Sequence, residues 1–235
     1  MNVDISIVIP VYNEEAILHA AVVDLRTRLA PYQWQYEIVL AENGSRDATV
    51  GIAEQLADRY PEVRHFSIGE PNYGRALKEG IRRAQGRLVI CDEIDLCDAD
   101  FHARAVTLLN ADAAKMVIGS KLIGGASDER PFVRHAASVV YSGLLRVLLG
   151  FRGTDTHGLK AFDRRVLLPI VEACVVEQDV FASELVIRAY RAGVEIQEIP
   201  VRVVEKRPPS INLFKRVPNV LRNVSKLTYA IRLRG

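Results

Sequence analysis

The chain has 235 residues, of which 49% are apolar and 26% charged, which suits one large folded domain and not a disordered chain. Its formal net charge of +2 conceals an asymmetry: residues 206–235 carry eight Lys or Arg and no acid, and the remainder has a formal charge of −6. Its cysteines, Cys91, Cys97 and Cys174, have neither disulfide nor zinc-ligand spacing, which favours packed thiols in a reducing cytoplasm.

The first ninety residues alternate between β-branched runs and helix-forming segments. Strands are expected at Ile5–Val11, Tyr36–Ala41 and Val63–Ile68. Helices are expected at Glu14–Leu29, at Ala48–Arg59 and from Asn72 to a stop at Gly86. Repeated strand–turn–helix units predict an α/β fold with a parallel sheet and right-handed crossovers.

A fourth apolar run, Arg87–Leu96, ends in three carboxylates, Asp92, Glu93 and Asp95. We expect a buried strand whose acids lie at its C-terminal end, where open parallel sheets bind ligands. Period-2 alternation would place Glu93 and Asp95 on one side and Asp92 on the other. Two carboxylates at i and i+2 can bind Mg²⁺ or Mn²⁺, which in turn can hold a diphosphate.

A second acidic pair, Asp98 and Asp100, follows at once and offers an alternative register for the same kind of site. One of the two pairs can instead begin a helix, and Asp100, just before Phe101, suits an N-cap. We assign Glu93 and Asp95 as the binding pair.

The second half of the chain is less regular. The expected elements are a strand at Lys115–Leu122, helices at Phe132–Leu149 and Val180–Arg191, and a half-exposed strand at Val194–Val204. The linker-like composition after Val204 divides the chain into a domain of residues 1–205 and a tail of residues 206–235.

Within this tail, cations alternate with apolar residues at helical spacing, namely Phe214, Val217, Leu221, Val224 and Leu227. Such a basic amphipathic helix can bind an anionic membrane surface, or it can dock on the domain through Leu221 and Val224. Its excess of cations favours the membrane. Its two aromatic residues are too sparse for base stacking, so no nucleic-acid partner is expected.

No segment reaches the ~20 apolar residues needed to span a bilayer, since the longest candidate, Val139–Leu149, is broken by Arg146. The first apolar run is too short for a signal peptide and lacks a basic start. We therefore expect a cytoplasmic protein that can lie peripherally on the cytoplasmic membrane face.

Four stretches resemble the family 2 inverting glycosyltransferases in order and spacing: Ile9–Glu15, Glu42–Thr49, Asn72–Gly86 and Glu93–Leu96. Further stretches look like the dolichyl-phosphate mannose and glucose synthase branch: Gly119–Lys121, Asp155–Phe162, Glu184–Leu185 and Glu198–Val201. The resemblance covers nearly the whole chain. It implies the nucleotide-sugar-binding GT-A fold, a mostly parallel Rossmann-like sheet flanked by helices.

The same resemblance implies transfer of a hexose from a GDP-mannose or UDP-glucose type of donor to a polyprenyl or dolichyl phosphate. A family 2 enzyme acting on a hydroxyl of a soluble acceptor and a non-catalytic nucleotide-binding regulator are the alternatives. The oligomeric state is left open.

The resemblance also implies roles for individual residues. At the nucleotide it places Pro10, Tyr12, Glu14, Glu42, Asn72 and Gly74. It gives Glu93 and Asp95 the catalytic and metal-binding positions, with Glu93 where the family usually has Asp and Cys97 where the synthases often have a metal-binding Gln. These departures bear on the metal site, because a thiol is a poor Mg²⁺ ligand.

On the acceptor side the resemblance places Lys121, Arg130, Arg134 and Asp155. Basic side chains suit a lipid phosphate, although the two arginines could instead pair with acids on a solvated face. His157 can be read as a base for a hydroxyl acceptor or as a polar packing residue. Glu184 can be read as a cleft residue or as an ordinary exposed helical Glu.

Overall fold

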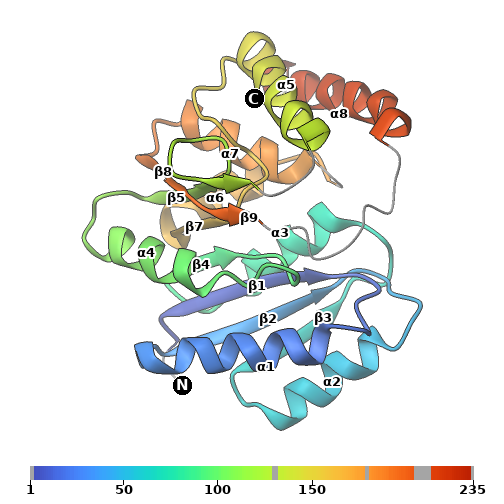
Figure 1. The fold of residues 1–235 in the computed structure, drawn as a ribbon, viewed down its shortest axis with the longest axis vertical. Helices are drawn as coiled ribbons and strands as arrows, with labels where there is room; N and C mark the ends of the chain where they lie inside the picture. The colour runs from blue at the N-terminus through green and yellow to red at the C-terminus, as the bar shows by residue number, and fades with distance from the viewer. Residues whose placement is uncertain (1–2, 129–131, 178–179, 204–212, 234–235) are drawn as a thin grey trace.

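The computed structural model describes residues 3–128, 132–177, 180–203 and 213–233. The main sheet in these ranges consists of β1 (Ile5–Val11), β2 (Tyr36–Glu42), β3 (Val63–Ser67), β4 (Leu88–Cys91), β5 (Met116–Ser120), β7 (Lys160–Asp163) and β8 (Ile196–Pro200). Its order is β3-β2-β1-β4-β7-β5-β8 (Figure 1). The two-residue strands β6 (Ser127–Asp128) and β9 (Arg202–Val203) pair in a separate small sheet.

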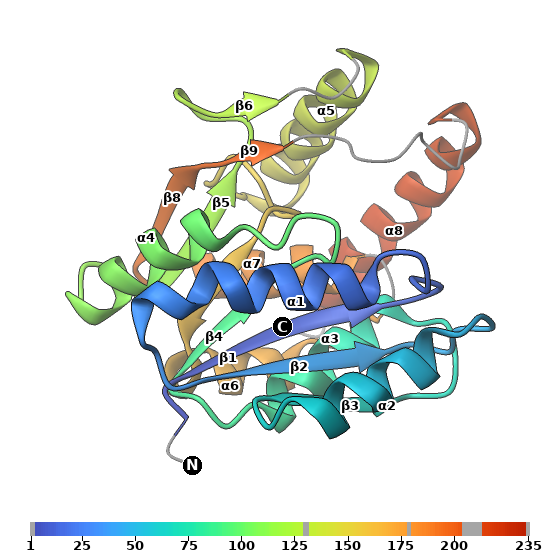
Figure 2. The same cartoon turned by 60° about the horizontal axis from the view of Figure 1, so that its bottom comes forward.

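The helices follow the strands as α1 (Leu18–Leu29), α2 (Thr49–Arg59), α3 (Tyr73–Arg83), α4 (Ala99–Asn110), α5 (Phe132–Leu149), α6 (Arg164–Ala173), α7 (Phe181–Arg191) and α8 (Leu213–Leu233), and a 3₁₀ turn, Ala30–Tyr32, extends α1. Core side chains of α1, α2 and α4 pack on one face of the sheet, and those of α3 and α5 to α8 pack on the other. Figure 2 shows α1 on the first of these faces, running alongside β1. The sheet is therefore buried between two helical layers, as the α/β pattern predicted.

Neighbouring strands are parallel except at β7, which runs antiparallel to both β4 and β5. Neither β7 nor α6 was expected from the sequence, because the four-residue run Lys160–Asp163 has a charged residue at each end and little strand character. The reversal matters for the site, since it brings the start of β7 to the edge where the parallel strands end.

Several expected boundaries move. Helix α1 begins at Leu18 instead of Glu14, because the backbone N–H groups of Ile17 and Leu18 both donate to the carbonyl of Glu14 and form a turn there. The expected strand Val194–Val204 is divided into β8 and β9. The other predicted strands and helices are present within a few residues of their expected ends.

The described part of α8 packs on the domain. Val224, Leu227 and Ile231 are almost completely buried in the core formed with α5 and α7. The guanidinium groups of Arg188 and Arg191 in α7 donate to the carbonyls of Ala230 and Ile231 at 3.3 Å and 3.1 Å. The second half of α8 therefore docks on the domain, which was the alternative to membrane binding for this helix. The side chains of Phe214, Val217 and Leu221 lie outside the described residues.

In the described ranges, we find no helix with both the length and the hydropathy that crossing a bilayer requires.

Candidate functional site

The carboxyl ends of β1, β2 and β4 meet at one edge of the sheet. The pairing register places Val11 beside Glu42 and Val8 beside Cys91. Strand β7 begins at the same edge, with Lys160 paired to Cys91. The loops that carry the predicted nucleotide, metal and acceptor residues consequently gather on one side of the molecule.

The loops after β1 and β2 are joined by reciprocal hydrogen bonds. The Asn13 N–H donates to Ser45 Oγ at 2.9 Å, and Asn13 Oδ1 accepts from the Arg46 N–H at 2.9 Å. The Glu14 N–H donates to Thr49 Oγ1 at 2.7 Å. Asn13 has a φ of +54°, a left-handed conformation that Asn tolerates and that lets both of its ends reach the neighbouring loop. The two loops therefore form one preorganised surface.

Three of the predicted nucleotide residues lie on or under this surface. Pro10 is buried in β1, Glu14 is half-buried, and the Tyr12 side chain is 39% exposed at the strand end. An exposed aromatic ring at this position is available for stacking on a base, whereas Pro10 only shapes the backbone.

Glu42, the predicted base or ribose contact, is buried at the end of β2. Its carboxylate accepts short hydrogen bonds from the Ser45 N–H and the Ser67 hydroxyl. Burial raises the pKa of Glu42, but these hydrogen bonds outweigh it and hold that pKa below its ordinary value. Glu42 is thus an ionised acceptor that fixes the loop after β2.

Asn72 and Gly74 lie at the N-terminus of α3. Asn72 caps the helix by accepting a 3.0 Å hydrogen bond from the Arg75 N–H, and Gly74 is buried in the first turn. The Asn72 amide also donates to Glu177 Oε2 at 3.0 Å. A helix N-terminus carries partial positive charge and favours an anion, so this end of α3 is compatible with the predicted place of Asn72 and Gly74 near the nucleotide.

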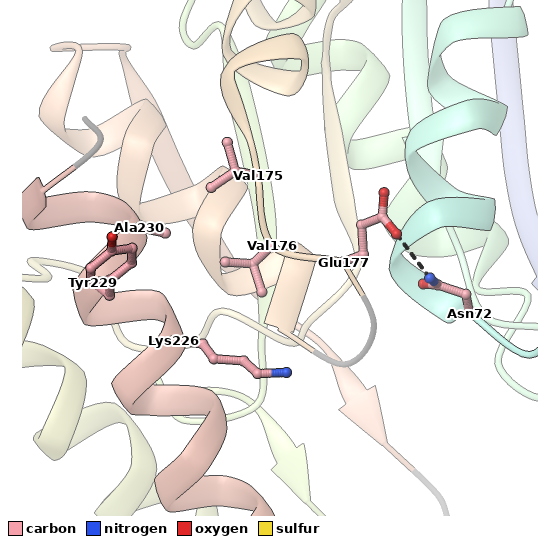
Figure 3. A pocket seen from close by; sticks show the side chains of 7 residues that line it. All are labelled: Asn72, Val175, Val176, Glu177, Lys226, Tyr229 and Ala230. Atoms are coloured by element: carbon pink, nitrogen blue, oxygen red, sulfur yellow. Dashed lines mark hydrogen bonds between the residues drawn. The ribbon is translucent and has the colours of Figure 1, made fainter.

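A pocket of about 390 Å³ opens beside Asn72, between the start of α3 and α8 (Figure 3). It is lined by Asn72, Val175, Val176, Glu177, Lys226, Tyr229 and Ala230. Figure 3 shows the Lys226 side chain extending from α8 toward Glu177 and Asn72. The C-terminal helix therefore borders the region of the candidate nucleotide site.

The acidic segment differs from its prediction in one respect. Strand β4 ends at Cys91, so the acids lie in the turn beyond it and do not follow strand alternation. Asp92 is fully buried against His102, whereas Glu93 and Asp95 are half-buried at the edge. The predicted separation of Asp92 from the other two is correct, but a turn and a buried partner cause it, not the strand period.

The structure also distinguishes the two acidic pairs. Asp98, not Asp100, is the N-cap of α4, and its side chain accepts from the N–H groups of Asp100 and Phe101 at 3.1 Å. Asp100 forms an exposed ion pair with Arg104 one turn later. The expectation that Asp100 caps this helix was therefore wrong by two residues. The acidic pair Asp98 and Asp100 does lie at the start of a helix, as the alternative interpretation of this pair predicted.

Glu93 is the most perturbed acid of the edge. Its pKa is raised to about 7, chiefly by burial and also by the charge of Asp95, while a 2.6 Å hydrogen bond from the Tyr73 hydroxyl and the charge of Lys160 oppose the rise. Burial and the nearby Glu93 in turn raise the pKa of Tyr73 well above its usual value, so the phenol stays protonated and donates. A carboxyl that is half protonated near neutral pH needs a positive partner to become fully ionised.

Sequence reasoning missed Lys160, a buried lysine at the start of β7. Its side chain is covered, its ammonium donates to the Gly158 carbonyl at 2.6 Å, and it forms no ion pair with a described carboxylate. Burial lowers the pKa of Lys160, while the charges of Asp155 and Glu93 oppose that effect. The only sequence signal for Lys160 is its place within the motif Asp155–Phe162, because a single Lys in a short apolar run does not by itself indicate a buried or functional lysine.

The acceptor residues are brought together in part. Lys121 and Asp155 form a nearly buried ion pair, and Asp155 also accepts from the His157 N–H at 2.9 Å. Burial raises the pKa of Asp155, but Lys121 and this hydrogen bond hold it below its ordinary value. Arg130 and the side chain of Arg134 lie outside the described residues.

For Glu184 and His157 the sequence left two interpretations each, and the structure bears on both residues. Glu184 is fully buried, neither exposed nor in the cleft, and it accepts from the Val175 and Val176 N–H groups and from Arg188. His157 is an exposed residue whose ring meets Tyr141 edge to face at 5.1 Å between ring centroids, and desolvation of the imidazole lowers its pKa to about 4. Glu184 therefore braces a loop.

The two carboxylates of Glu93 and Asp95 are ligands of the type that Mg²⁺ and Mn²⁺ prefer. No group of three or more His, Cys, Asp or Glu side chains in the described ranges could hold a metal by itself. Mg²⁺ commonly takes one or two carboxylates and completes its coordination with substrate phosphates and water. The Cys97 thiol is excluded as a ligand because it is buried in the core and directed at the Ile94 carbonyl.

Residues 6–168 match the model of a protein family described as glycosyl transferase family 2. The chain is 27% identical over 222 residues to glycosyltransferase AglD of Haloferax volcanii, covering 92% of this chain and 35% of that protein. It is 26% identical over 217 residues to a dolichyl-phosphate beta-glucosyltransferase of Trichomonas vaginalis, covering 85% and 65% of the two chains. The chain thus spans between about a third and two thirds of these relatives.

Among solved structures, the chain is similar to glucosyl-3-phosphoglycerate synthase from Mycobacterium tuberculosis in complex with Mn²⁺, uridine diphosphate and phosphoglyceric acid. The TM-score is 0.67 at 21% sequence identity, over 96% of this chain and 78% of that one. Another crystal structure of the same synthase gives a TM-score of 0.66 at 20% identity, over 97% of this chain and 80% of that one. At this identity the likeness establishes the fold, which is the GT-A arrangement expected from the sequence.

Proposed function

The chain belongs to glycosyl transferase family 2, and from this premise we propose that it transfers a hexose from a nucleotide-diphosphate sugar to a polyprenyl or dolichyl phosphate. The observation that carries the proposal is the turn after β4, where Glu93 and Asp95 are half-buried and Glu93 accepts a hydrogen bond from Tyr73. This turn lies at the edge that also holds the joined loops after β1 and β2.

The donor would lie along that edge. The exposed ring of Tyr12 is placed to stack on the base, and the N-terminus of α3 favours the charge of the diphosphate. Glu93 and Asp95 would hold a divalent cation, which neutralises the charge that grows on the leaving diphosphate. The Tyr73 hydroxyl orients Glu93 and favours its ionised form.

The acceptor determines whether a base is needed. A lipid phosphate has a second pKa of roughly 6, so it is already a dianion near neutral pH and can attack the anomeric carbon directly. Its binding requires cations, and Lys121 and Lys160 supply two at this edge, with Asp155 balancing one of them. The named glucosyltransferase activity of the Trichomonas relative supports this acceptor class.

A second candidate is transfer to a hydroxyl of a soluble acceptor. The observation that favours it is His157, an exposed residue whose backbone N–H is held by Asp155 and whose imidazole has a pKa lowered to about 4, chiefly by desolvation, so that it is neutral near neutral pH. A hydroxyl acceptor needs a base to remove its proton, and an imidazole can serve. The solved synthase, whose complex contains phosphoglyceric acid, supports this class only by its fold.

Thermal-shift screening tests the donor site. GDP and UDP, each with Mg²⁺ or Mn²⁺, are added to the purified chain; a ligand at 100 times its Kd should stabilise it by about 2.7 kcal/mol. No shift with any combination would contradict the proposal. The nucleotide that raises the Tm identifies the nucleobase of the sugar donor.

Comparing transfer with hydrolysis tests the acceptor. Arg134→Ala is expected to reduce transfer to polyprenyl phosphate far more than hydrolysis of the donor, because an arginine fork binds two phosphate oxygens. Equal loss of both reactions would show that Arg134 has a structural role and does not bind the acceptor. Transfer to a soluble hydroxyl acceptor, unaffected by Arg134→Ala but lost in His157→Ala, would favour the second candidate.

A further inference from the structure

His102 in α4 and Asp92 after β4 lie against each other in the core. Both side chains are 0% exposed, and Nε2 of His102 is 2.6 Å from Oδ2 of Asp92. The other oxygen, Oδ1 of Asp92, accepts a 2.7 Å hydrogen bond from the Glu93 N–H. Asp92 therefore connects the imidazole to the first residue of the turn that carries Glu93 and Asp95.

The same segment is fixed at its far end. The Asp98 side chain caps α4, and the Asp98 carbonyl accepts a 3.0 Å hydrogen bond from the His102 N–H. Within the turn, the N–H groups of Leu96 and Cys97 both donate to the Glu93 carbonyl at 3.0 Å. The chain from Asp92 to His102 is thus a closed loop, and the imidazole–carboxylate contact is the bond that closes it.

This arrangement is not one that stability alone would favour. Nδ1 of His102 is buried, and the described residues offer it no hydrogen-bond partner. An unpartnered buried nitrogen lowers stability, and a buried polar pair is often no better for folding than apolar side chains of similar volume. What the pair provides that apolar side chains could not is a directional hold on the Glu93 N–H.

We propose that His102 is a positioning residue, which acts through Asp92 to hold the turn of Glu93 and Asp95 in the geometry that binds a nucleoside diphosphate with its divalent cation. This inference rests on the proposed function, because that function assigns the turn to the donor. If the pair served stability alone, the stability of the fold and the order of the turn would be lost together. The inference predicts instead that the turn can lose its order while the fold keeps its stability.

The central variant is Asp92→Ala/His102→Leu, which removes both buried polar groups and leaves neither unpaired. We expect it to keep the Tm of the wild type or exceed it. Its affinity for UDP or GDP in the presence of Mn²⁺ should fall about 10- to 100-fold, as when a residue that orients a metal ligand is lost. Its affinity for the nucleotide without metal should not change, because the loops after β1 and β2 are untouched.

His102→Gln is the rescue variant, since its amide N–H can still donate to Asp92. We expect it to retain most of the Mn²⁺-dependent affinity. The matched control is Ser6→Ala, which removes a buried 2.6 Å hydrogen bond from Ser6 to Glu37 at the opposite edge of the same sheet. It should lower Tm and leave the Mn²⁺-dependent affinity unchanged.

A double variant that folds and binds nucleotide with Mn²⁺ as tightly as the wild type would overturn the inference. Unfolding of both the double variant and His102→Gln would also overturn it, by assigning the pair to stability. Hydrogen exchange gives a readout that does not depend on any ligand: the amides of residues 93–97 should exchange faster in the double variant than in the wild type, and unchanged exchange would overturn the inference. A wild-type chain that binds no nucleotide would instead contradict the proposed function, and exchange would still decide the role of His102.

Discussion

The hydroxyl of Tyr73 donates a 2.6 Å hydrogen bond to Oε1 of Glu93, and so joins the first turn of α3 to the acidic turn after β4. These residues belong to two motifs that are separate in the sequence. Their contact makes one site of them, because the helix end that suits a phosphate and the carboxylate that suits a cation now share a hydrogen bond.

Tyr73→Phe should raise the pKa of Glu93 above its value of about 7 in the metal-free protein. Burial is the main cause of that raised pKa, and the hydrogen bond from Tyr73 counteracts it by favouring the ionised form. Removing the hydroxyl takes away the largest opposing effect and leaves only the charge of Lys160 to counteract burial and the charge of Asp95, so the protonated form gains. Carboxyl-carbon NMR across a pH titration measures the change.

Tyr32→Phe is the control for this titration, because the Tyr32 ring is exposed and stacks on Trp34 away from the edge. It should leave the Glu93 titration unchanged. An unchanged or lower pKa in Tyr73→Phe would show that the hydroxyl does not act on Glu93.

Asp95→Asn should abolish metal-dependent transfer, a loss of at least about 100-fold, because it removes one of two carboxylates that can hold the cation. Its free energy of unfolding should change by no more than about 0.5 kcal/mol, since a half-buried side chain in the turn after β4 contributes little packing. Asp100→Asn is the matched control: its side chain is 75% exposed and pairs only with Arg104 in the described structure. Equal activity of the two variants would contradict the choice of register.

Gly158→Ala should destabilise the fold by about 1–3 kcal/mol, because the added methyl group would overpack a backbone contact. A Cβ at Gly158 would lie 1.8 Å from the Gly119 carbonyl oxygen, where neither backbone can yield easily. Chemical denaturation measures the effect. The control is Gly143→Ala in α5, where nothing lies within 4 Å of the added Cβ and the higher helix propensity of Ala should stabilise. Similar stabilities for the two variants would contradict the close approach.

Binding to anionic vesicles should weaken in the double variant Arg222→Glu/Lys226→Glu. Both side chains are exposed on α8, and each cation near an anionic surface contributes about 1 kcal/mol before screening. Charge reversal is preferable to truncation after Glu205, which would uncover the core contacts of Leu227 and its neighbours. Co-sedimentation with vesicles at increasing salt measures the binding.

The control for the vesicle experiment is Arg59→Glu, an exposed cation at the end of α2, which lies far from α8 in both views (Figures 1 and 2). It should bind vesicles as the wild type does. Vesicle binding that the α8 double variant retains in full would assign this helix to docking alone.

The sequence determined the first half of the fold and the place of the candidate site. Runs such as Ile5–Val11 and Tyr36–Glu42 are buried along nearly their whole length, and that is why apolar, β-branched composition identifies them. Parallel strands end at a common edge, so acids placed after β4 had to lie beside the loops after β1 and β2. These inferences needed only local composition and the rule for ligands in open sheets.

Only the tertiary structure decided which polar groups meet. Cys91 and Lys160 are paired because a short strand is inserted antiparallel between β4 and β5. Asp92 finds His102, and Glu184 is buried under a loop, through contacts that no periodicity encodes. Hydrophobic period reports which face of an element is buried, but the partner of a buried charge depends on chain segments that folding brings together from a distance, and its pKa follows from that partner.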